Sequence, residues 1–177
     1  MKFFKVKNNN IKLRLMTLND TDNIIKWRNN PRVYNNFIYQ GNLTEEIHLQ
    51  WIKNVIETKK AVQFIIVIND GGVSYDIGSV YFRDINYEHK KAEYGIFIGD
   101  DRFVGQGYGT IACRLACQYA FEVMNLHKIF LRVFATNHQA IKSYEKVGFI
   151  KEGLFRDDVY IQGKFIDVIF MGLINSN

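Results

Sequence analysis

Apolar and polar residues alternate in several short segments of the chain, and a period of two is typical of a half-buried β-strand. The first such segment is Ile11–Leu15. Two others lie close to the C-terminus, where Gly163 indicates the turn that joins them. The alternation predicts strands at residues 11–15, 61–69, 77–86, 92–99, 127–136, 156–161 and 165–173.

A helical period of about 3.6 residues occurs between these strands. Apolar residues repeat every four positions from Ile111 to Val123 and predict a long helix. Thr44 is placed to cap another helix, and Gly148 is placed to end a third. Residues 30–43 are aromatic and follow neither period, so this segment is predicted to be irregular. Further helices are predicted at residues 22–29, 44–58 and 139–147.

The order of these elements, βααβββαβαββ, predicts a mixed α/β (α+β) fold. We expect a central, mostly antiparallel, twisted sheet of about seven strands, flanked by about four helices. The 177 residues contain one proline and no repeat or low-complexity linker. A single domain that spans residues 1–177 is therefore expected.

The composition is that of an ordinary globular protein, with 47% hydrophobic and 23% charged residues. The net charge of +5 comes from scattered basic residues rather than from a basic stripe, so no nucleic-acid partner is expected. No apolar run reaches about 18 residues, so no membrane partner is expected either. Residues 1–5 lack the apolar region of a secretory signal, which favours a cytoplasmic location.

Cys113 and Cys117 are four residues apart in the long predicted helix and therefore share one face. We expect both cysteines to be small buried apolar side chains. No histidine or carboxylate beside them has the spacing of a zinc ligand, so no metal site is predicted.

The strongest chemical signal is a glycine-rich turn at Arg102–Thr110, between a predicted strand and the long helix. Its three glycines, at positions 105, 107 and 109, let the backbone approach a ligand closely. Free N–H groups at the start of the helix favour a phosphate or pyrophosphate there. A Rossmann turn would need glycine at Thr110, and a P-loop would need a Gly-Lys-Ser/Thr sequence, so neither nucleotide motif fits.

A second motif follows one helix and one strand later. Residues 137–149 contain Asn137, Ala140, Tyr144 and the pair Gly148-Phe149. Together with the Arg-x-x-Gly-x-Gly sequence that begins the glycine turn, this motif resembles the GNAT acetyltransferases, and in particular their branch that acetylates ribosomal proteins or spermidine. The resemblance covers about residues 11–173. It implies the GNAT fold, acetyl-CoA as the acyl donor without a metal, and direct transfer of the acetyl group to a primary amine.

The resemblance also implies which residues bind acetyl-CoA. Backbone N–H groups of the glycine turn would hold the pyrophosphate. The strand before the turn would separate from its neighbour and expose backbone groups to the pantetheine arm. Asn137 would cap a helix and contact the pantetheine. The predicted cofactor-binding residues are Ile96, Phe97, Ile98, Arg102, Val104, Gly105, Gln106, Gly107, Tyr108, Gly109, Thr110 and Asn137.

Two catalytic residues are implied in the same way. The hydroxyl of Tyr144 would donate a proton to the leaving thiolate, since a reference phenol pKa of about 10 lies near the thiol value of about 8.5. Glu93, on the strand before the glycine turn, would take a proton from the acceptor amine. The alternative role of Tyr144 is that of a core aromatic. The alternative for Glu93 is an ion pair with a nearby lysine or with Arg132.

The acceptor side shows two different resemblances. Residues 26–31 and 45–49 resemble the N-terminal part of UDP-4-amino-sugar N-acetyltransferases. This resemblance implies an amino sugar or sugar nucleotide as acceptor and makes Trp27, Arg28 and His48 candidate substrate residues; a buried tryptophan beneath an arginine is the alternative for the first two. The C-terminal part resembles spermidine and ribosomal-protein acetyltransferases. A protein N-terminus and a polyamine such as spermidine therefore remain open as acceptors.

Two further possibilities remain open. A catalytically inactive, CoA-binding regulatory module would keep the glycine turn but would lose Tyr144 or the strand carboxylate, and neither is lost here. An edge strand near the C-terminus would suit a homodimer, a state that the resemblance makes possible.

Overall fold

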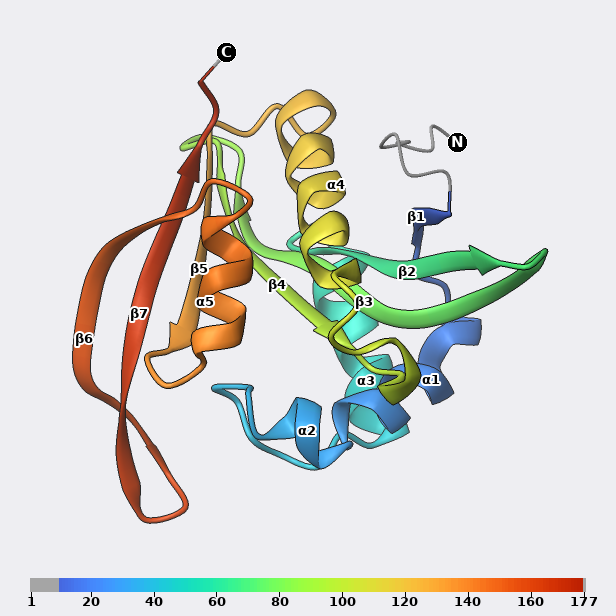
Figure 1. The fold of residues 1–177 in the computed structure, drawn as a ribbon, viewed down its shortest axis with the longest axis horizontal. Helices are drawn as coiled ribbons and strands as arrows, with labels where there is room; N and C mark the ends of the chain where they lie inside the picture. Colours follow the sequence, from blue (N-terminus) through green and yellow to red (C-terminus); the bar gives the residue numbers. More distant parts are fainter. Residues whose placement is uncertain (1–9, 177) are drawn as a thin grey trace.

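The computed structural model describes residues 10–176. Residues 1–9 and 177 lie outside the described part. The prediction about a secretory signal concerns residues 1–5 and therefore also lies outside it. The seven strands of the described part form one sheet in the order β1-β2-β3-β4-β5-β7-β6 (Figure 1). The strands are β1 (Ile11–Leu15), β2 (Val62–Asp70), β3 (Val73–Asn86), β4 (Lys91–Ile98), β5 (Lys128–Phe134), β6 (Ile150–Ile161) and β7 (Lys164–Ile174).

All neighbouring strands in this sheet are antiparallel except β4 and β5, which are parallel. The predicted mixed α/β fold with a mostly antiparallel sheet is therefore confirmed. The described part has five α-helices rather than about four: α1 (Thr21–Arg28), α2 (Pro31–Tyr34), α3 (Glu45–Trp51), α4 (Tyr108–Glu122) and α5 (His138–Glu145). Helix α3 continues into a π-helical turn at Ile52–Ile56.

The sheet is covered on both faces, and strand β2 shows how its sequence allows this. Phe64, Ile66 and Ile68 point to the face that packs against α4 and α5. Ile65 and Val67, which alternate with them, point to the opposite face and pack with residues of α1 and α2. All five side chains are buried, as expected for a strand with a continuous apolar sequence. Figure 1 shows α4 and α5 together on one side of the sheet.

Two segments differ from the prediction. Residues 30–43 were predicted to be irregular, yet Pro31–Tyr34 forms the one-turn helix α2. Proline fixes a helical φ at its first position, and the Asn30 side chain accepts a hydrogen bond from the Arg32 N–H at 3.0 Å. Strand β6 begins at Ile150 rather than near residue 156. Its first half is mostly exposed and therefore lacks the apolar alternation that marks a half-buried strand.

The two cysteines have the expected environment, since Cys113 and Cys117 are both free and buried. Among the described residues, no group of three or more His, Cys, Asp or Glu side chains is placed to hold a metal ion. No helix of this part of the chain is both long and apolar enough to cross a membrane.

Candidate active site

Strands β4 and β5 are paired over only part of their length. The parallel register runs from Lys91 opposite Lys128 to Glu93 opposite Phe130, and beyond this point the strands separate (Figure 1). Residues 94–98 continue β4 and pair with β3 on the other side. Separation of two strands leaves backbone N–H and C=O groups free to bind a ligand.

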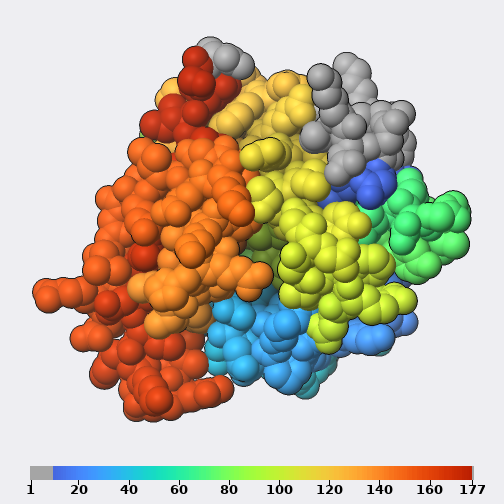
Figure 2. Space-filling view, viewed as in Figure 1, coloured from blue at the N-terminus to red at the C-terminus, as the bar shows by residue number. Residues whose placement is uncertain are grey.

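The opening leads into a cavity of about 500 Å³, a volume typical of small-molecule sites. Its walls come from β4, β5, the glycine turn, α5 and residues 32–39. Figure 2 shows the surface hollowed where the yellow-green glycine turn, the orange helix α5 and the light-blue segment around α2 meet. Three segments that are distant in the sequence thus form one pocket.

The glycine turn has the backbone geometry of an anion cradle. Gly105 and Gly107 have φ values of 77° and 83°, a left-handed conformation that favours glycine. Gly107 is the N-cap of α4 and provides no capping side chain. Within the described residues, the N–H groups of residues 105–109 form no hydrogen bond. Free N–H groups at a helix N-terminus suit a phosphate, so these residues fit the CoA pyrophosphate.

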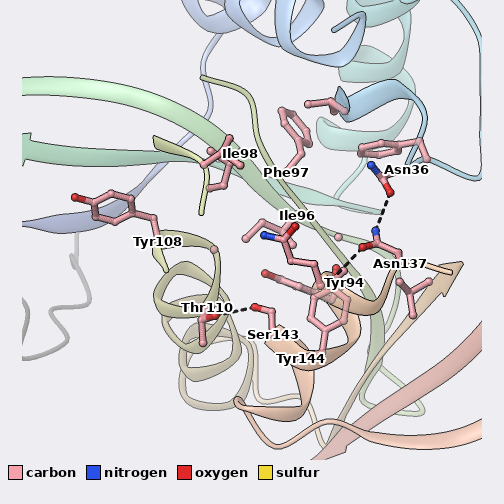
Figure 3. Close-up of a pocket in the computed structure, with 18 of the residues that line it drawn as sticks. Asn36, Tyr94, Ile96, Phe97, Ile98, Tyr108, Thr110, Asn137, Ser143 and Tyr144 are labelled. Atoms are coloured by element: carbon pink, nitrogen blue, oxygen red, sulfur yellow. Dashed lines mark hydrogen bonds between the residues drawn. The ribbon is translucent and has the colours of Figure 1, made fainter. Parts of the chain in front are cut away.

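Side-chain hydrogen bonds join the elements that surround the pocket (Figure 3). The hydroxyls of Thr110 and Ser143 are 2.7 Å apart and share a hydrogen bond. The Asn137 side chain caps α5 by accepting a hydrogen bond from the Ala140 N–H at 3.1 Å, which confirms the predicted cap. Its amide group also donates to Asn36 Oδ1 at 2.9 Å, and this bond ties α5 to the segment after α2.

Tyr144 lies on α5 and lines the pocket. Its ring meets the ring of Tyr94 edge to face, with centroids 6.3 Å apart, and also contacts Phe149. Burial raises the pKa of Tyr144 well above its ordinary value. The phenol therefore stays protonated at neutral pH, but the raised pKa also makes it a weaker acid than a free tyrosine.

Glu93 lies where β4 and β5 begin to separate, and its carboxylate contacts two arginines. Arg83 donates two hydrogen bonds of 3.0 Å, one from Nε to Glu93 Oε2 and one from Nη2 to Glu93 Oε1. Arg132 donates from Nε at 3.1 Å and from Nη2 at 3.3 Å. Burial alone would raise the pKa of Glu93, but the hydrogen bonds from both arginines outweigh it and the pKa is lowered. A lowered pKa makes the carboxylate a weaker proton acceptor. The ion pair with Arg132, which was the alternative to a role as base, is present in the structure.

Ten of the twelve predicted cofactor-binding residues line the pocket; Arg102 and Gln106 do not. The Arg102 guanidinium turns to Asp100, with Nη2 2.6 Å from Oδ2. The Gln106 side chain donates back to the Arg102 carbonyl at 2.7 Å. Both side chains thus stabilise the turn itself, because they form local hydrogen bonds on an exposed surface.

The predicted substrate residues do not line the pocket, and two of them are part of the protein core. Trp27 is buried and packs against Phe97. His48 is buried beside Trp51, and burial lowers its pKa. Both sequence segments are helical, and the helical period places these residues on the inner face. Arg28 lies over the ring of Phe37, which does line the pocket, at 3.4 Å from its centroid.

The lining residues that sequence reasoning missed include Asn36, Tyr39, Tyr81 and Arg83. Tyr81 is opposite Gly95 in the register of β3 and β4, and its ring fills the space of a missing side chain. A Cβ on Gly95 would lie 2.2 Å from Tyr81 Cζ. The glycine in an otherwise bulky strand was the available signal for such a close approach.

Comparisons with known proteins agree with this geometry. A family model described as an acetyltransferase (GNAT) domain matches residues 10–150. Spermidine N(1)-acetyltransferase of Vibrio cholerae is 37% identical over 100 residues, which cover 56% of this chain and 57% of that protein. The putative ribosomal N-acetyltransferase YdaF of Bacillus subtilis is 31% identical over 108 residues, which cover 59% of this chain and 58% of that protein. The matched segments therefore span little more than half of these curated relatives.

A similar solved structure covers more of the chain. The crystal structure of spermidine N-acetyltransferase from Vibrio cholerae in complex with CoA and spermine aligns with a TM-score of 0.87 and 28% identity. The alignment includes 96% of this chain and 98% of that chain.

Proposed function

The chain belongs to the GNAT acetyltransferase family. We propose that it transfers an acetyl group from acetyl-CoA directly to a primary amine. One observation carries the proposal: the pocket between β4 and β5 joins the free N–H groups of the glycine turn to Tyr144. A phosphate cradle and a proton donor in one pocket are what direct acyl transfer from a CoA thioester requires.

The donor would supply the activated thioester, and the chain would orient it. The N–H groups of residues 105–109 would bind the pyrophosphate, and β4 would offer backbone groups to the pantetheine arm. The Asn137 side chain uses one amide hydrogen for Asn36 and one lone pair of its oxygen for the Ala140 N–H, so its second amide hydrogen and its second lone pair are not used by these bonds. We therefore expect Asn137 to position the pocket wall and also to be able to contact the pantetheine with the remaining donor or acceptor.

Proton transfer has two parts. The Tyr144 hydroxyl holds a proton at neutral pH and would give it to the leaving thiolate. The acceptor amine must lose a proton, because an amine with a pKa of about 10 is mostly charged at neutral pH. Glu93 would remove this proton directly, or water would do so. If Glu93 is the base, Glu93→Gln flattens the rise of rate with pH, whereas an unaltered profile assigns the step to water.

Three acceptor classes are supported by different observations. The relatives named as spermidine N-acetyltransferases support a polyamine better than an amino sugar. A ribosomal-protein N-terminus has support from one relative of similar coverage. An amino sugar or sugar nucleotide is favoured by the resemblance of residues 26–31 and 45–49 and by the positive charge of the pocket, in which Glu93 is the only acidic residue among the described lining residues.

A thiol-release screen tests the function and separates these acceptors. Purified protein is mixed with acetyl-CoA and, in separate wells, with spermidine, an N-terminal ribosomal peptide or an amino-sugar nucleotide. Acceptor-dependent release of free CoA, with the acetylated amine found by mass spectrometry, is the expected result. Tight acetyl-CoA binding without transfer to any acceptor would instead favour an inactive CoA-binding module.

A homodimer is the oligomeric state that we infer from the edge of the sheet. Strand β6 is an edge strand, and Ile150, Leu154 and Tyr160 on it are more than half exposed. Exposed apolar side chains on a long edge strand favour association with another chain. Sedimentation equilibrium should give twice the monomer mass for the wild type and the monomer mass for Leu154→Lys. A monomeric wild type would contradict the proposal.

A further inference from the structure

The pocket has a second positively charged region, separate from the glycine turn. Arg83 and Arg132 lie beside Glu93, five residues before Ile98 at the end of β4. At about 3.3 Å per strand residue, Glu93 lies about 16 Å along β4 from Ile98, the end of the strand that precedes the glycine turn. A pyrophosphate held at the turn would leave these arginines free to meet the other substrate.

The charges in this region do not balance. Two guanidiniums share the single carboxylate of Glu93, so the three groups together carry a net positive charge. Asp84 lies 4.0 Å from Arg83 but is three-quarters exposed, so water screens it. The Arg83 guanidinium also lies 5.1 Å from the ring centroid of Tyr39.

Arg28 adds a third cation behind the Phe37 side of the pocket wall. Its guanidinium packs on Phe37, and within the described residues it forms neither an ion pair nor a hydrogen bond. Burial and the charge of Arg83 both lower the pKa of Arg28, whereas Tyr81 raises it. Tyr81 and Arg83 lie two residues apart on β3 and line the pocket together with Arg132. Tyr144 lines the same pocket, so Arg83 and Arg132 share one cavity with the proposed reaction centre.

A half-buried cation without a counter-ion is costly unless a ligand supplies the opposite charge. We propose that Arg83 and Arg132, with the charge of Arg28 behind the Phe37 ring, bind an anionic group, a phosphate or a carboxylate, that the acceptor carries near its primary amine. This inference rests on the proposed function and narrows its acceptor to an anionic amine. A polycation such as spermidine would bring its charges against the same three arginines, and repulsion would weaken its binding.

Calorimetric titration of the CoA-saturated protein tests the inference. Bound CoA occupies the glycine turn, so a further anion reports on the arginine region. The probes are UDP and D-glucosamine 6-phosphate for a phosphate, 4-aminobutyrate for a carboxylate, and spermidine as the polycation. At least one anionic probe should bind at least about tenfold more tightly than spermidine, the effect of one charge-assisted hydrogen bond.

Three variants locate the binding. Arg28→Gln leaves the two ion pairs of Glu93 intact and should weaken the anionic probe about tenfold or more while CoA affinity stays the same. Arg28→Lys should recover part of the loss. Arg156→Gln removes an exposed arginine of β6 outside the pocket and should change neither affinity.

The two proposals fail in different ways. Spermidine binding as tightly as the best anionic probe, or no binding by any anionic probe, would overturn the inference while acetyl transfer to an amine still stands. A probe affinity that Arg28→Gln leaves unchanged would also overturn it. Failure of the protein to bind CoA in the first titration would count against the proposed function itself.

Discussion

At the scale of single residues, neighbours decide what a side chain can do. Glu93 could be recognised from the sequence as a carboxylate on the strand before the glycine turn. Its partners could not, because Arg83 and Arg132 reach it through the registers of β3 and β5 with β4. Glu93 accepts four hydrogen bonds from two guanidiniums, so its structural role is to hold the two arginines in place.

The stability contribution of Glu93 should depend on pH. Its pKa in the folded protein lies below the ordinary value of 4.5, so the stabilisation is complete above about pH 4.5 and is lost as pH falls through the folded value. At pH 7, Glu93→Gln should lower the free energy of unfolding by about 1–3 kcal/mol, since the partly exposed arginines lose their counter-ion.

Urea unfolding at pH 7 and at pH 3 measures this difference. The gap between wild type and Glu93→Gln should narrow at the lower pH. Asp84→Asn removes an exposed carboxylate near the same Arg83 and should change stability by less than about 0.5 kcal/mol. An equal gap at both pH values would show that the ion pairs do not supply the stability.

Tyr144→Phe should lower kcat by about 10²-fold or more, because it removes the proton donor for the leaving thiolate. The ring contacts with Tyr94 and Phe149 remain, so the affinity for CoA should change little. Steady-state rates and calorimetry measure the two quantities. Tyr94→Phe, a hydroxyl deletion on the neighbouring ring, should keep most of the wild-type kcat. An unchanged kcat in Tyr144→Phe would leave that residue with a packing role only.

At the scale of elements, local patterns predicted most strands and helices because one face of each is buried. The exceptions have physical causes. The one-turn helix α2 is too short for a helical period, and the start of β6 is exposed and therefore does not alternate. The separation of β4 from β5 has no local signature, since it depends on two strands that a helix separates in the sequence.

The glycine turn allows an element-scale prediction with a matched control. Gly107 has a φ of 83° and Gly71, in the β2–β3 turn, has a φ of 56°; a Cβ at either position meets no atom within 4 Å. Gly107→Ala and Gly71→Ala should therefore each cost about 1–2 kcal/mol of stability through backbone strain alone. Only Gly107→Ala should weaken CoA binding, by about tenfold, because it shifts free N–H groups of the cradle. Equal CoA affinity in the two variants would place the pyrophosphate elsewhere.

At the scale of the whole molecule, the donor half of the pocket could be predicted and the acceptor half could not. The donor half comes from two contiguous motifs, so ten of its twelve predicted residues line the cavity. The acceptor half combines single residues of α1, the segment after α2, β3, β4 and β5, which only the folded sheet brings together. Trp27 lies on α1 and His48 lies on α3, and the sequence does not show which face of each helix is buried in the folded protein.

The opening between β4 and β5 is the acetyl-CoA site that we propose for this chain. Calorimetric titration of the wild-type protein with acetyl-CoA tests it most directly, with Gly71→Ala and Gly107→Ala alongside. We predict saturable binding of one acetyl-CoA per chain with a Kd below about 1 mM, preserved in Gly71→Ala and weakened in Gly107→Ala. No heat of binding by the wild type at millimolar acetyl-CoA would contradict the claim.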